Sequence, residues 1–310
     1  MPNGEPLISA RGLVKRFGKL TAVDGIDVEV HAAEAFGFLG PNGAGKSSTM
    51  RMIGCVSAPS GGELRILGMD PVRQGSLIRA RLGVCPQQDS LDPELTLEEN
   101  LVVYARYFGI PRRVAKERAA ELLSFVQLAE RANEKVEPLS GGLKRRLTIA
   151  RALVNEPEIV LLDEPTTGLD PQARHLVWER LFRLKQRGVT LVLTTHYMDE
   201  AEQLCDRLVV MDNGKIVAEG SPRQLIEQHS TREVVELRFG EEALDSFVGK
   251  LDGVGERIEL LPDRILLYAS DGDAALAAVH DRHLTPSSVL VRRSTLEDVF
   301  LHLTGRTLVD

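Results

Sequence analysis

The sequence predicts an α/β fold, and three of its stretches carry that prediction. An apolar run over residues 35–39 leads into the glycine-rich segment 40–47, after which a helical pattern begins. Two later apolar runs, 159–162 and 189–193, each end in polar side chains. Apolar runs of this length are typical of strands that are buried on both faces of a parallel sheet. Ligands bind at the carboxyl ends of such strands, so the polar residues that follow them are candidates for a functional site.

Length, composition and charge narrow the classes of protein that fit. A chain of 310 residues is long enough for about two domains. Its net charge of −7 disfavours sequence-independent nucleic-acid binding, which needs many phosphate contacts, so we expect no nucleic-acid partner. The three cysteines lie far apart, so neither a zinc site nor a disulfide framework is expected. No apolar run approaches the roughly 18 residues of a membrane-spanning helix, and work at a membrane would therefore need a partner.

Segment 40–47 has the pattern G-x-x-x-x-G-K-S of a phosphate-binding loop. Its glycines allow the backbone to curl until successive N–H groups point at phosphate oxygens. Lys46 adds a positive charge for the outer phosphates, Ser47 offers a hydroxyl to Mg²⁺, and the helix that follows presents its positive end to the anion. The residues expected to bind nucleotide here are Gly40, Pro41, Asn42, Gly43, Ala44, Gly45, Lys46, Ser47 and Ser48.

Strands are expected on both sides of this loop. Residues 7–30 alternate between apolar and polar side chains, which predicts strands, and residues 61–68 predict a further strand. Phe17 could stack on a nucleobase for ~1–3 kcal/mol, although its local sequence favours a core position. Gln87 follows a short apolar strand and could ligate a metal or orient a water, although by itself it is more typical of a loop.

The region from about 89 to 157 changes to helical periodicity and predicts a helical insert. Thr96 and Glu99 form a capping box at the start of a helix that Pro111 ends, and a second helix is expected over about 114–128.

The stretch Leu-Ser-Gly-Gly precedes the third helix of the insert. Ser140 is a natural N-cap, and Gly141 and Gly142 expose backbone N–H groups beside the positive end of that helix. This arrangement predicts a second anion site, while an ordinary capped helix explains the same residues without any ligand.

Four polar residues follow the later strands. Asp163 and Glu164 end the second apolar strand, where charges are costly unless they meet a cation or take part in chemistry. We therefore expect Asp163 to bind Mg²⁺ and Glu164 to handle an attacking water. Asp170 lies in the turn before a helix over 172–187. His196 ends the next strand; a lone histidine there is more often a core residue, but it is the third polar group at one sheet edge and is a candidate for function.

The C-terminal part of the chain follows a different pattern. Residues 206–220 predict two strands around an Asn-Gly turn, followed by a short helix over 221–228. The order strand–helix–strand–strand–helix–strand then predicts a small α+β domain of the split βαβ type. A last helix is expected to dock an apolar stripe on that domain's own sheet or on a neighbouring subunit. The stripe consists of Leu296, Val299, Phe300 and Leu303.

The order of these motifs resembles that in ATP-binding subunits of ATP-binding-cassette (ABC) transporters. The resemblance covers residues 7–228, and its most specific part is Leu-Ser-Gly-Gly followed by Leu-Leu-Asp-Glu-Pro-Thr-Thr-Gly-Leu-Asp. It implies a Mg²⁺-dependent ATPase that binds ATP. The implied fold is a P-loop NTPase cassette over 5–228, with an N-terminal antiparallel β subdomain and a helical subdomain over about 89–157, followed by an accessory or regulatory domain over 229–310. One departure is Leu143, because the family usually has Gln at this place in the signature.

The resemblance also implies a role for each candidate residue. Glu164 would be the catalytic base, His196 the γ-phosphate switch, and Gln87 a sensor of Mg²⁺ and of the partner. Phe17 would stack on adenine, and Asp170 would face a second subunit. The implied metal contacts are Ser47, Gln87 and Asp163, and the implied signature residues are Ser140, Gly141 and Gly142.

Three segments place the resemblance in an exporting branch. Residues 168–174, 204–208 and 296–306 are similar to the branch that exports antibiotics, and still more to ATPases that export nodulation lipo-oligosaccharides. The resemblance implies pairing with a second copy or a paralogous subunit under a separate transmembrane permease, at the cytoplasmic face of the membrane. Each ATP would then lie between the phosphate loop of one subunit and the signature of the other.

Other functions fit the sequence less well. An importer ATPase is the nearest alternative. Soluble relatives in chromosome maintenance carry a long coiled coil between phosphate loop and signature, but Lys46 and Ser140 are separated by 94 positions (140 − 46). Soluble relatives in translation carry two cassettes in one chain, whereas this chain has one. A guanine-nucleotide switch would need an Asn-Lys-x-Asp motif, which the sequence lacks.

Overall fold

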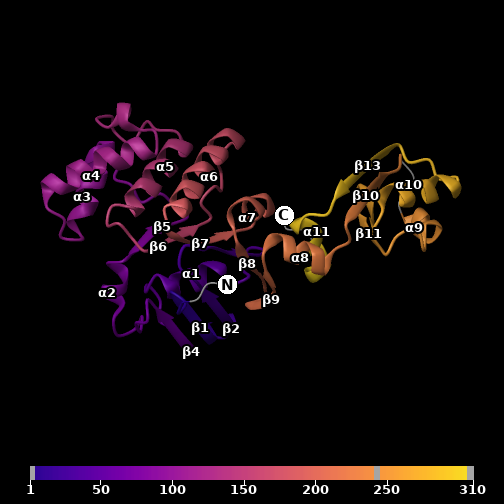
Figure 1. Cartoon of the computed structure of the whole chain (residues 1–310), viewed down its shortest axis with the longest axis horizontal. Coiled ribbons are helices and arrows are strands. Elements are labelled where there is room, and N and C mark those ends of the chain that lie inside the picture. Colours follow the sequence, from indigo (N-terminus) through magenta and orange to yellow (C-terminus); the bar gives the residue numbers. More distant parts are fainter. Residues whose placement is uncertain (1–3, 241–244, 306–310) are drawn as a thin grey trace. The chain divides into compact units, whose positions relative to one another are not determined.

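The computed structural model describes residues 4–240 and 245–305. Contacts divide the chain into two compact units, residues 1–219 and 220–310 (Figure 1). The domain boundary expected after residue 228 lies one helix later than this division, because the helix Pro222–His229 (α8) packs on the last helix of the second unit. The first helix predicted in the C-terminal domain is expected to begin at Glu242. That residue, and Arg306 at the end of the segment 296–306, lie outside the described residues.

A six-stranded sheet forms the centre of the first unit. Its strands are Ala35–Leu39 (β3), Leu82–Cys85 (β5), Ile159–Asp163 (β6), Thr190–Thr195 (β7), Arg207–Asp212 (β8) and Lys215–Gly220 (β9). They lie in the order β5-β6-β7-β3-β8-β9, and the pairs from β5 to β8 are parallel. The turn into β9 is made by Asn213 and Gly214, whose φ angles of 48° and 77° suit a two-residue hairpin.

A second sheet of this unit is antiparallel. Its strands are Ile8–Phe17 (β1), Leu20–Val30 (β2) and Gly61–Ile66 (β4), in the order β2-β1-β4. The alternating pattern of the sequence turns one face of this sheet inward. Ile8 and Leu13 on that face share a core with Phe36 of the central sheet, and all three side chains are fully buried.

Helices pack along the central sheet and position the strand ends. They span Lys46–Ile53 (α1), Gly75–Arg79 (α2), Pro171–Gln186 (α6) and Met198–Leu204 (α7). Helix α1 begins directly after the phosphate-binding loop, as predicted. The sequence did not predict α2 and α7, because five and seven residues are too few to show a helical period.

The helical insert comprises Leu97–Arg106 (α3), Arg112–Phe125 (α4), a 3₁₀ turn at Ala129–Arg131 and Gly141–Ala152 (α5). The predicted capping box is present: the Thr96 hydroxyl accepts from the Glu99 N–H at 3.1 Å, and the Glu99 carboxylate accepts from the Thr96 N–H at 2.9 Å. Leu101, Leu123 and Leu147 belong to a core that the insert forms for itself. Figure 1 shows α3, α4 and α5 gathered away from the three-stranded sheet.

The second unit has the predicted split βαβ arrangement. After α8 it contains Glu233–Arg238 (β10), Asp245–Leu251 (α9), Arg257–Leu261 (β11), Arg264–Ala269 (β12), Gly272–Asp281 (α10), Ser288–Arg293 (β13) and Leu296–Thr304 (α11). The sheet order is β11-β12-β10-β13, with every pair antiparallel. Val235, Leu267 and Val279 belong to the core that α9 and α10 close on one face.

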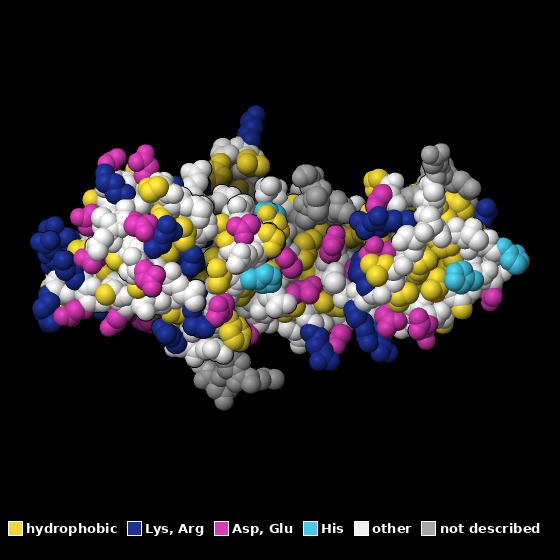
Figure 2. Space-filling model, turned by 90° about the horizontal axis from the view of Figure 1, so that it is seen from above, with side chains coloured by type: hydrophobic (Ala, Val, Ile, Leu, Met, Phe, Trp, Pro, Cys, Tyr) yellow, Lys and Arg dark blue, Asp and Glu magenta, His cyan; other side chains and the backbone are white. Residues whose placement is uncertain are grey.

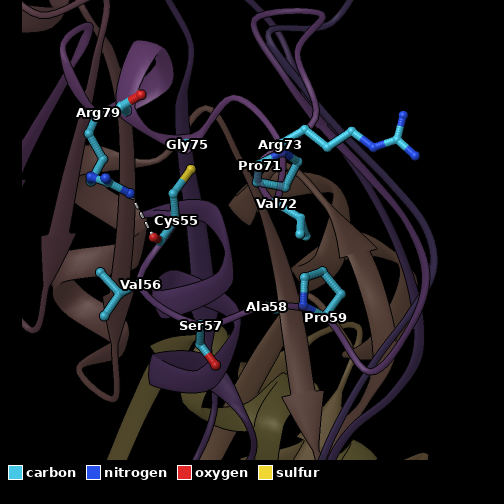
Figure 3. Close-up of a pocket in the computed structure, with 11 residues that line it drawn as sticks. Cys55, Val56, Ser57, Ala58, Pro59, Pro71, Val72, Arg73, Gly75 and Arg79 are labelled. Atoms are coloured by element: carbon cyan, nitrogen blue, oxygen red, sulfur yellow. Dashed lines mark hydrogen bonds between the residues drawn. The ribbon is translucent and has the colours of Figure 1, made fainter.

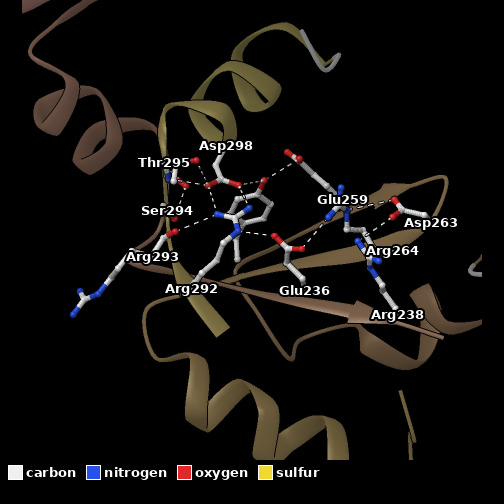
Figure 4. A network of polar contacts seen from close by, with 12 residues as sticks. Glu236, Arg238, Glu259, Asp263, Arg264, Arg292, Arg293, Ser294, Thr295 and Asp298 are labelled. Carbon is white, nitrogen blue, oxygen red and sulfur yellow. Dashed lines mark hydrogen bonds and ion pairs between the residues drawn. The ribbon is translucent and has the colours of Figure 1, made fainter. Parts of the chain in front are cut away.

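A network of ionic and polar contacts covers part of the other face of this sheet (Figure 4). Arg292 donates through Nη1 to Asp298 at 2.7 Å and through Nε to Glu236 at 2.6 Å. Asp298 is 1% exposed and also accepts from the Tyr268 hydroxyl at 3.2 Å. Burial alone would raise the pKa of Asp298, but the bonds from Arg292 and Thr295 hold it below its usual value. The network fastens the start of α11 to the sheet.

Helix α11 docks on its own sheet through a residue outside the expected stripe. Leu301 clusters with Val234, Leu266 and Tyr268 on the face opposite α9 and α10. Within the expected stripe, Leu303 is half-buried and the other three members are fully buried; they are Leu296, Val299 and Phe300.

The architecture confirms the predicted fold class, an α/β unit with an antiparallel β subdomain and a helical insert, followed by a small α+β unit. In the described parts of the chain, no helix combines the length and the apolarity needed to cross a bilayer. Acidic and basic side chains are interspersed on the face seen in Figure 2, with no large field of one sign.

Candidate functional site

The loop between β3 and α1 has the backbone geometry of an anion cradle. Gly43 and Gly45 have φ angles of 83° and 104°, a region that side chains disfavour. A Cβ on Gly45 would lie 2.4 Å from the Ala22 carbonyl oxygen, so glycine is also needed for space. These φ angles give the curled backbone that a phosphate-binding loop needs, and the positive end of α1 adds to the attraction for phosphate.

Lys46 closes this loop from inside. The side chain is 4% exposed, and its ammonium group donates to the carbonyl oxygens of Gly40 at 2.6 Å and Pro41 at 2.9 Å. Burial lowers the pKa of Lys46, an effect that the nearby carboxylates of Glu164 and Asp163 partly offset. An ammonium held against two carbonyls is available to exchange them for phosphate oxygens.

Asp163 and Ser47 meet where β6 ends beside α1. The Ser47 hydroxyl donates to Asp163 Oδ1 at 3.2 Å, and the Thr194 hydroxyl from β7 donates to the same oxygen at 2.5 Å. A hydroxyl and a carboxylate oxygen at this distance are the ligands that Mg²⁺ prefers. The oxygens of Ser47 and Asp163 therefore fit a magnesium ion, which these two residues would help to hold.

Glu164 lies one residue further, and three side chains surround its carboxylate. Gln87 Nε2 donates to Oε2 at 2.9 Å, Thr167 donates to the same oxygen at 3.1 Å, and His196 Nδ1 is 3.4 Å from Oε1. The contact from His196 outweighs burial and holds the pKa of Glu164 below its usual value. Glu164 is 7% exposed and has a φ of 46°, a backbone conformation found at functional sites. An ionised, partly enclosed carboxylate of this kind is suited to accept a proton from water.

The remaining predicted residues lie outside this cluster. Phe17 is 49% exposed at the end of β1, with the Lys15 ammonium 5.0 Å from its ring centre, so the core position favoured by its local sequence is wrong. Ser140 is the N-cap of α5 but makes no capping bond with its side chain. Asp170 caps α6 by accepting from the Ala173 N–H at 2.9 Å. No described hydrogen bond joins Ser140 or Asp170 to the Glu164 cluster.

Sequence reasoning missed several residues that hold the cluster together. Thr194 and Thr167 lack a distinguishing pattern, because single hydroxyls occur throughout the chain. Arg145 could have been noticed within the basic run Lys144-Arg145-Arg146, but a charged run on a helix usually indicates a solvated face. In the structure Arg145 is 4% exposed and bonded to the backbone of this site.

Two hollows adjoin helix α2, away from the phosphate loop. One has a volume of about 570 Å³ and is lined by residues of α2, β5 and α3, among them Tyr104, Tyr107 and Phe108. The other, of about 370 Å³, lies between the end of α1 and α2, where Arg79 Nη1 donates to the Cys55 carbonyl at 3.0 Å (Figure 3). Three aromatic side chains line the larger hollow, and one of them, Tyr107, is 82% exposed. Exposed apolar side chains that gather in this way are unusual on a free surface.

Comparison with known proteins identifies the chain. Residues 23–167 match the family model described as ABC transporter, and residues 244–305 match the C-terminal domain of the nodulation factor export protein NodI. A Nod factor export ATP-binding protein I from Ralstonia nicotianae is 45% identical over 309 residues, covering 98% of this chain and 96% of the relative. One from Rhizobium etli is 46% identical over 295 residues, covering 95% and 92%.

The chain belongs to the ABC transporter family of ATP-binding proteins. A solved dimeric ATP-binding cassette in a post-hydrolysis state, bound to ADP and Pi, is similar to this ABC protein with a TM-score of 0.63 and 29% identity, over 69% of this chain and 98% of that one. The ADP form of another ABC transporter cassette gives a TM-score of 0.66 and 26% identity, over 73% and 95%. The expected ABC-type ATPase that binds ATP is thereby confirmed.

Proposed function

We propose that this ABC ATPase drives export of a lipo-oligosaccharide through a separate membrane permease. The relatives named for Nod factor export match it over nearly the full length, including the second unit. The observation that best supports ATP hydrolysis is that Gln87 and His196 both contact Glu164 beside the phosphate loop. Phosphoryl transfer to water requires a phosphate-binding loop and a base that lie close together, and this cluster provides both.

ATP is held by the loop of residues 40–48 in this proposal. Lys46 releases the carbonyls of Gly40 and Pro41 and binds the outer phosphates instead. Ser47 and Asp163, with the amide oxygen of Gln87, supply oxygens for Mg²⁺. When bound, that ion neutralises charge on the outer phosphates.

Glu164 acts as the base. It accepts a proton from water as the water oxygen forms a bond to the terminal phosphorus, and the bond to the leaving ADP oxygen breaks. His196, 3.4 Å from Glu164 Oε1, lies where it can donate to an oxygen of the transferred phosphoryl group. Gln87 and Thr167 hold the carboxylate in place through the other oxygen.

Two copies, or this chain and a paralogous subunit, complete each site. The exposure of Ser140 and Gly141 supports this, because the first turn of α5 offers N–H groups that its own site does not use. Phe17, exposed beside Lys15, would stack on adenine, and Asp170 would face the second subunit as well as capping α6.

The 570 Å³ hollow beside α3 is the proposed seat of a permease helix. Its lining combines three aromatic side chains with Arg79 and Arg118, and with the exposure of Tyr107 this supports a helix that has both apolar and polar side chains. Such a partner would hold the chain at the cytoplasmic face of the membrane as a peripheral subunit.

Inside-out membrane vesicles carrying the complex test the direction and the substrate. With ATP in the medium, an exporter accumulates labelled lipo-oligosaccharide in the vesicle lumen, and the Glu164→Gln complex serves as the inactive control. Accumulation in right-side-out vesicles that contain ATP would instead identify an importer. If no membrane protein co-purifies with the chain from detergent extracts of its own host, the transport function itself is wrong.

A further inference from the structure

Arg145 is a buried cation beside the Glu164 cluster that has no part in the hydrolysis steps proposed above. It lies on α5, one turn after the Ser-Gly-Gly stretch, and is 4% exposed. Its guanidinium carries five N–H groups. Their partners are the backbone carbonyl oxygens of Pro86, Gln87, Asp163, Glu164 and Pro165.

These partners belong to two separate segments of the site. Nη1 donates to the carbonyls of Pro86 at 2.5 Å and Gln87 at 3.4 Å, in the loop after β5. Nη2 donates to Asp163 at 2.9 Å and Glu164 at 3.1 Å, at the end of β6. One planar group therefore fixes the distance between the backbone of Gln87 and the backbone of Glu164.

The chemistry of the contact requires arginine. The nearest carboxylate oxygen, from Asp89, is 3.9 Å away, so the charge is balanced chiefly by carbonyl dipoles. Those dipoles come from a backbone that includes Glu164 at a φ of 46°, which persists only where its surroundings hold it. A lysine ammonium keeps the charge but has three donors on one atom and does not span both segments.

We propose that Arg145 is a positioning residue for ATP hydrolysis. It holds the backbone of Gln87 and Glu164 in the register in which the Gln87 amide reaches the Glu164 carboxylate at 2.9 Å. Arg145 lies on α5, which begins at the signature residues. The helix that would contact a neighbour's nucleotide is therefore hydrogen-bonded directly to the end of β6 in its own chain. The inference rests on the proposed role of Glu164 as the base.

The test compares Arg145→Lys with Arg146→Lys in the full chain. Arg146 is the adjacent arginine on α5, half-buried and bonded to the Val126 carbonyl at 3.1 Å within the helical insert. For Arg145→Lys we expect kcat to fall by about 10-fold or more, since small misplacements of catalytic groups cost up to about 100-fold. The affinity for ATP, measured by equilibrium binding, should stay within about threefold of the wild type, because the phosphate loop is untouched. Arg146→Lys should match the wild type in both.

A double variant separates positioning from general destabilisation. If Arg145 acts through Glu164, adding Arg145→Lys to Glu164→Gln slows single-turnover hydrolysis little further. The inference is wrong if the rate losses of the two single substitutions multiply in the double variant. It is also wrong if Arg145→Lys and Arg146→Lys have the same kcat. If the lysine variant does not fold, Arg145→Gln replaces it in both comparisons, with the same expected and contradicting results. A Glu164→Gln chain as active as the wild type would instead remove the base, and with it the proposed mechanism.

Discussion

At the scale of residues, the surroundings of Glu164 suit its carboxylate to the proposed role of base. Contact with His196 holds the pKa of this carboxylate below its usual value, Gln87 donates a hydrogen bond to it, and Lys46 lies nearby. We predict that Glu164→Gln retains ATP binding and slows hydrolysis by at least ~100-fold, the scale of a lost general base. Steady-state phosphate release and nucleotide binding measure the two effects. Glu158→Gln, just before the other end of β6 in an exposed pair with Arg81, is the control and should keep wild-type turnover.

A second buried carboxylate, Glu200 on α7, makes stability depend on pH. Glu200 is fully buried and accepts from the Thr166 hydroxyl at 2.7 Å and from Trp178 Nε1 at 3.2 Å. Burial raises the pKa of Glu200 above its usual value, against the effect of these bonds. A raised folded-state pKa means that its contribution is fully present below the unfolded value of about 4.3 and is lost as pH rises through the folded pKa.

Glu200→Gln should therefore gain stability relative to the wild type as pH rises, because the amide keeps the shape and does not ionise. Urea unfolding between about pH 5 and about pH 8 measures the difference in the free energy of unfolding. Glu121→Gln, an exposed position on α4, should leave the pH dependence unchanged. A constant difference between the Glu200 variant and the wild type over this range would show that Glu200 does not titrate there.

At the scale of elements, the end of helix α3 lies at the hollow where we propose that a permease helix docks. Tyr107 follows the last turn of α3, 82% exposed, with its ring 6.2 Å from that of Tyr104. Tyr107→Asp should abolish co-purification with the permease and ATP-driven export, because it replaces an aromatic contact with a charge that is costly to bury under a docked helix. The ATPase rate of the chain alone should stay within about twofold, since no catalytic contact is lost. Val217→Asp, another exposed apolar position, on β9, is the control that should keep export. Export by the Tyr107 variant at the wild-type level would exclude the hollow as the docking place.

At the scale of the whole molecule, two truncated chains test what the second unit does. Helix α8 packs on α11, and its Leu225 is fully buried. A chain cut after residue 228 therefore keeps α8 without its partner and exposes an apolar side chain worth about 1.5–3 kcal/mol when buried. A chain cut after residue 219 avoids that exposure, so it should remain the more soluble of the two.

We propose that the second unit regulates hydrolysis or pairing, and the shorter chain also tests this hypothesis. We expect it to bind ATP, because the site lies wholly within residues 1–219, but to differ from the full chain in dimerisation or in resting ATPase rate. Sedimentation velocity and phosphate release measure the two properties. If both equal those of the full chain and export is also unchanged, the second unit is a passive appendage.

Much of the candidate site was predictable because its chemistry is local in sequence. The loop around Lys46 and the carboxylates at the end of β6 are recognisable by short patterns whose backbone consequences are fixed by a few residues. Phe17 shows the limit of this reasoning. Whether an aromatic residue in an alternating strand faces the core or the solvent depends on register and on the sheet that covers it, which no local pattern contains.

Periodicity and backbone preference act over a few positions. The amino-acid sequence was therefore enough to predict the order of elements, the split βαβ pattern of the second unit and the residue types that can bind phosphate and metal. Which of these residues meet depends on the folded chain. Gln87 and Glu164 are 77 positions apart, and Arg145 reaches both through backbone carbonyls, which every residue type offers alike. A bond to a carbonyl does not constrain the identity of the residue that accepts it, so contacts of this kind become visible once the chain is folded.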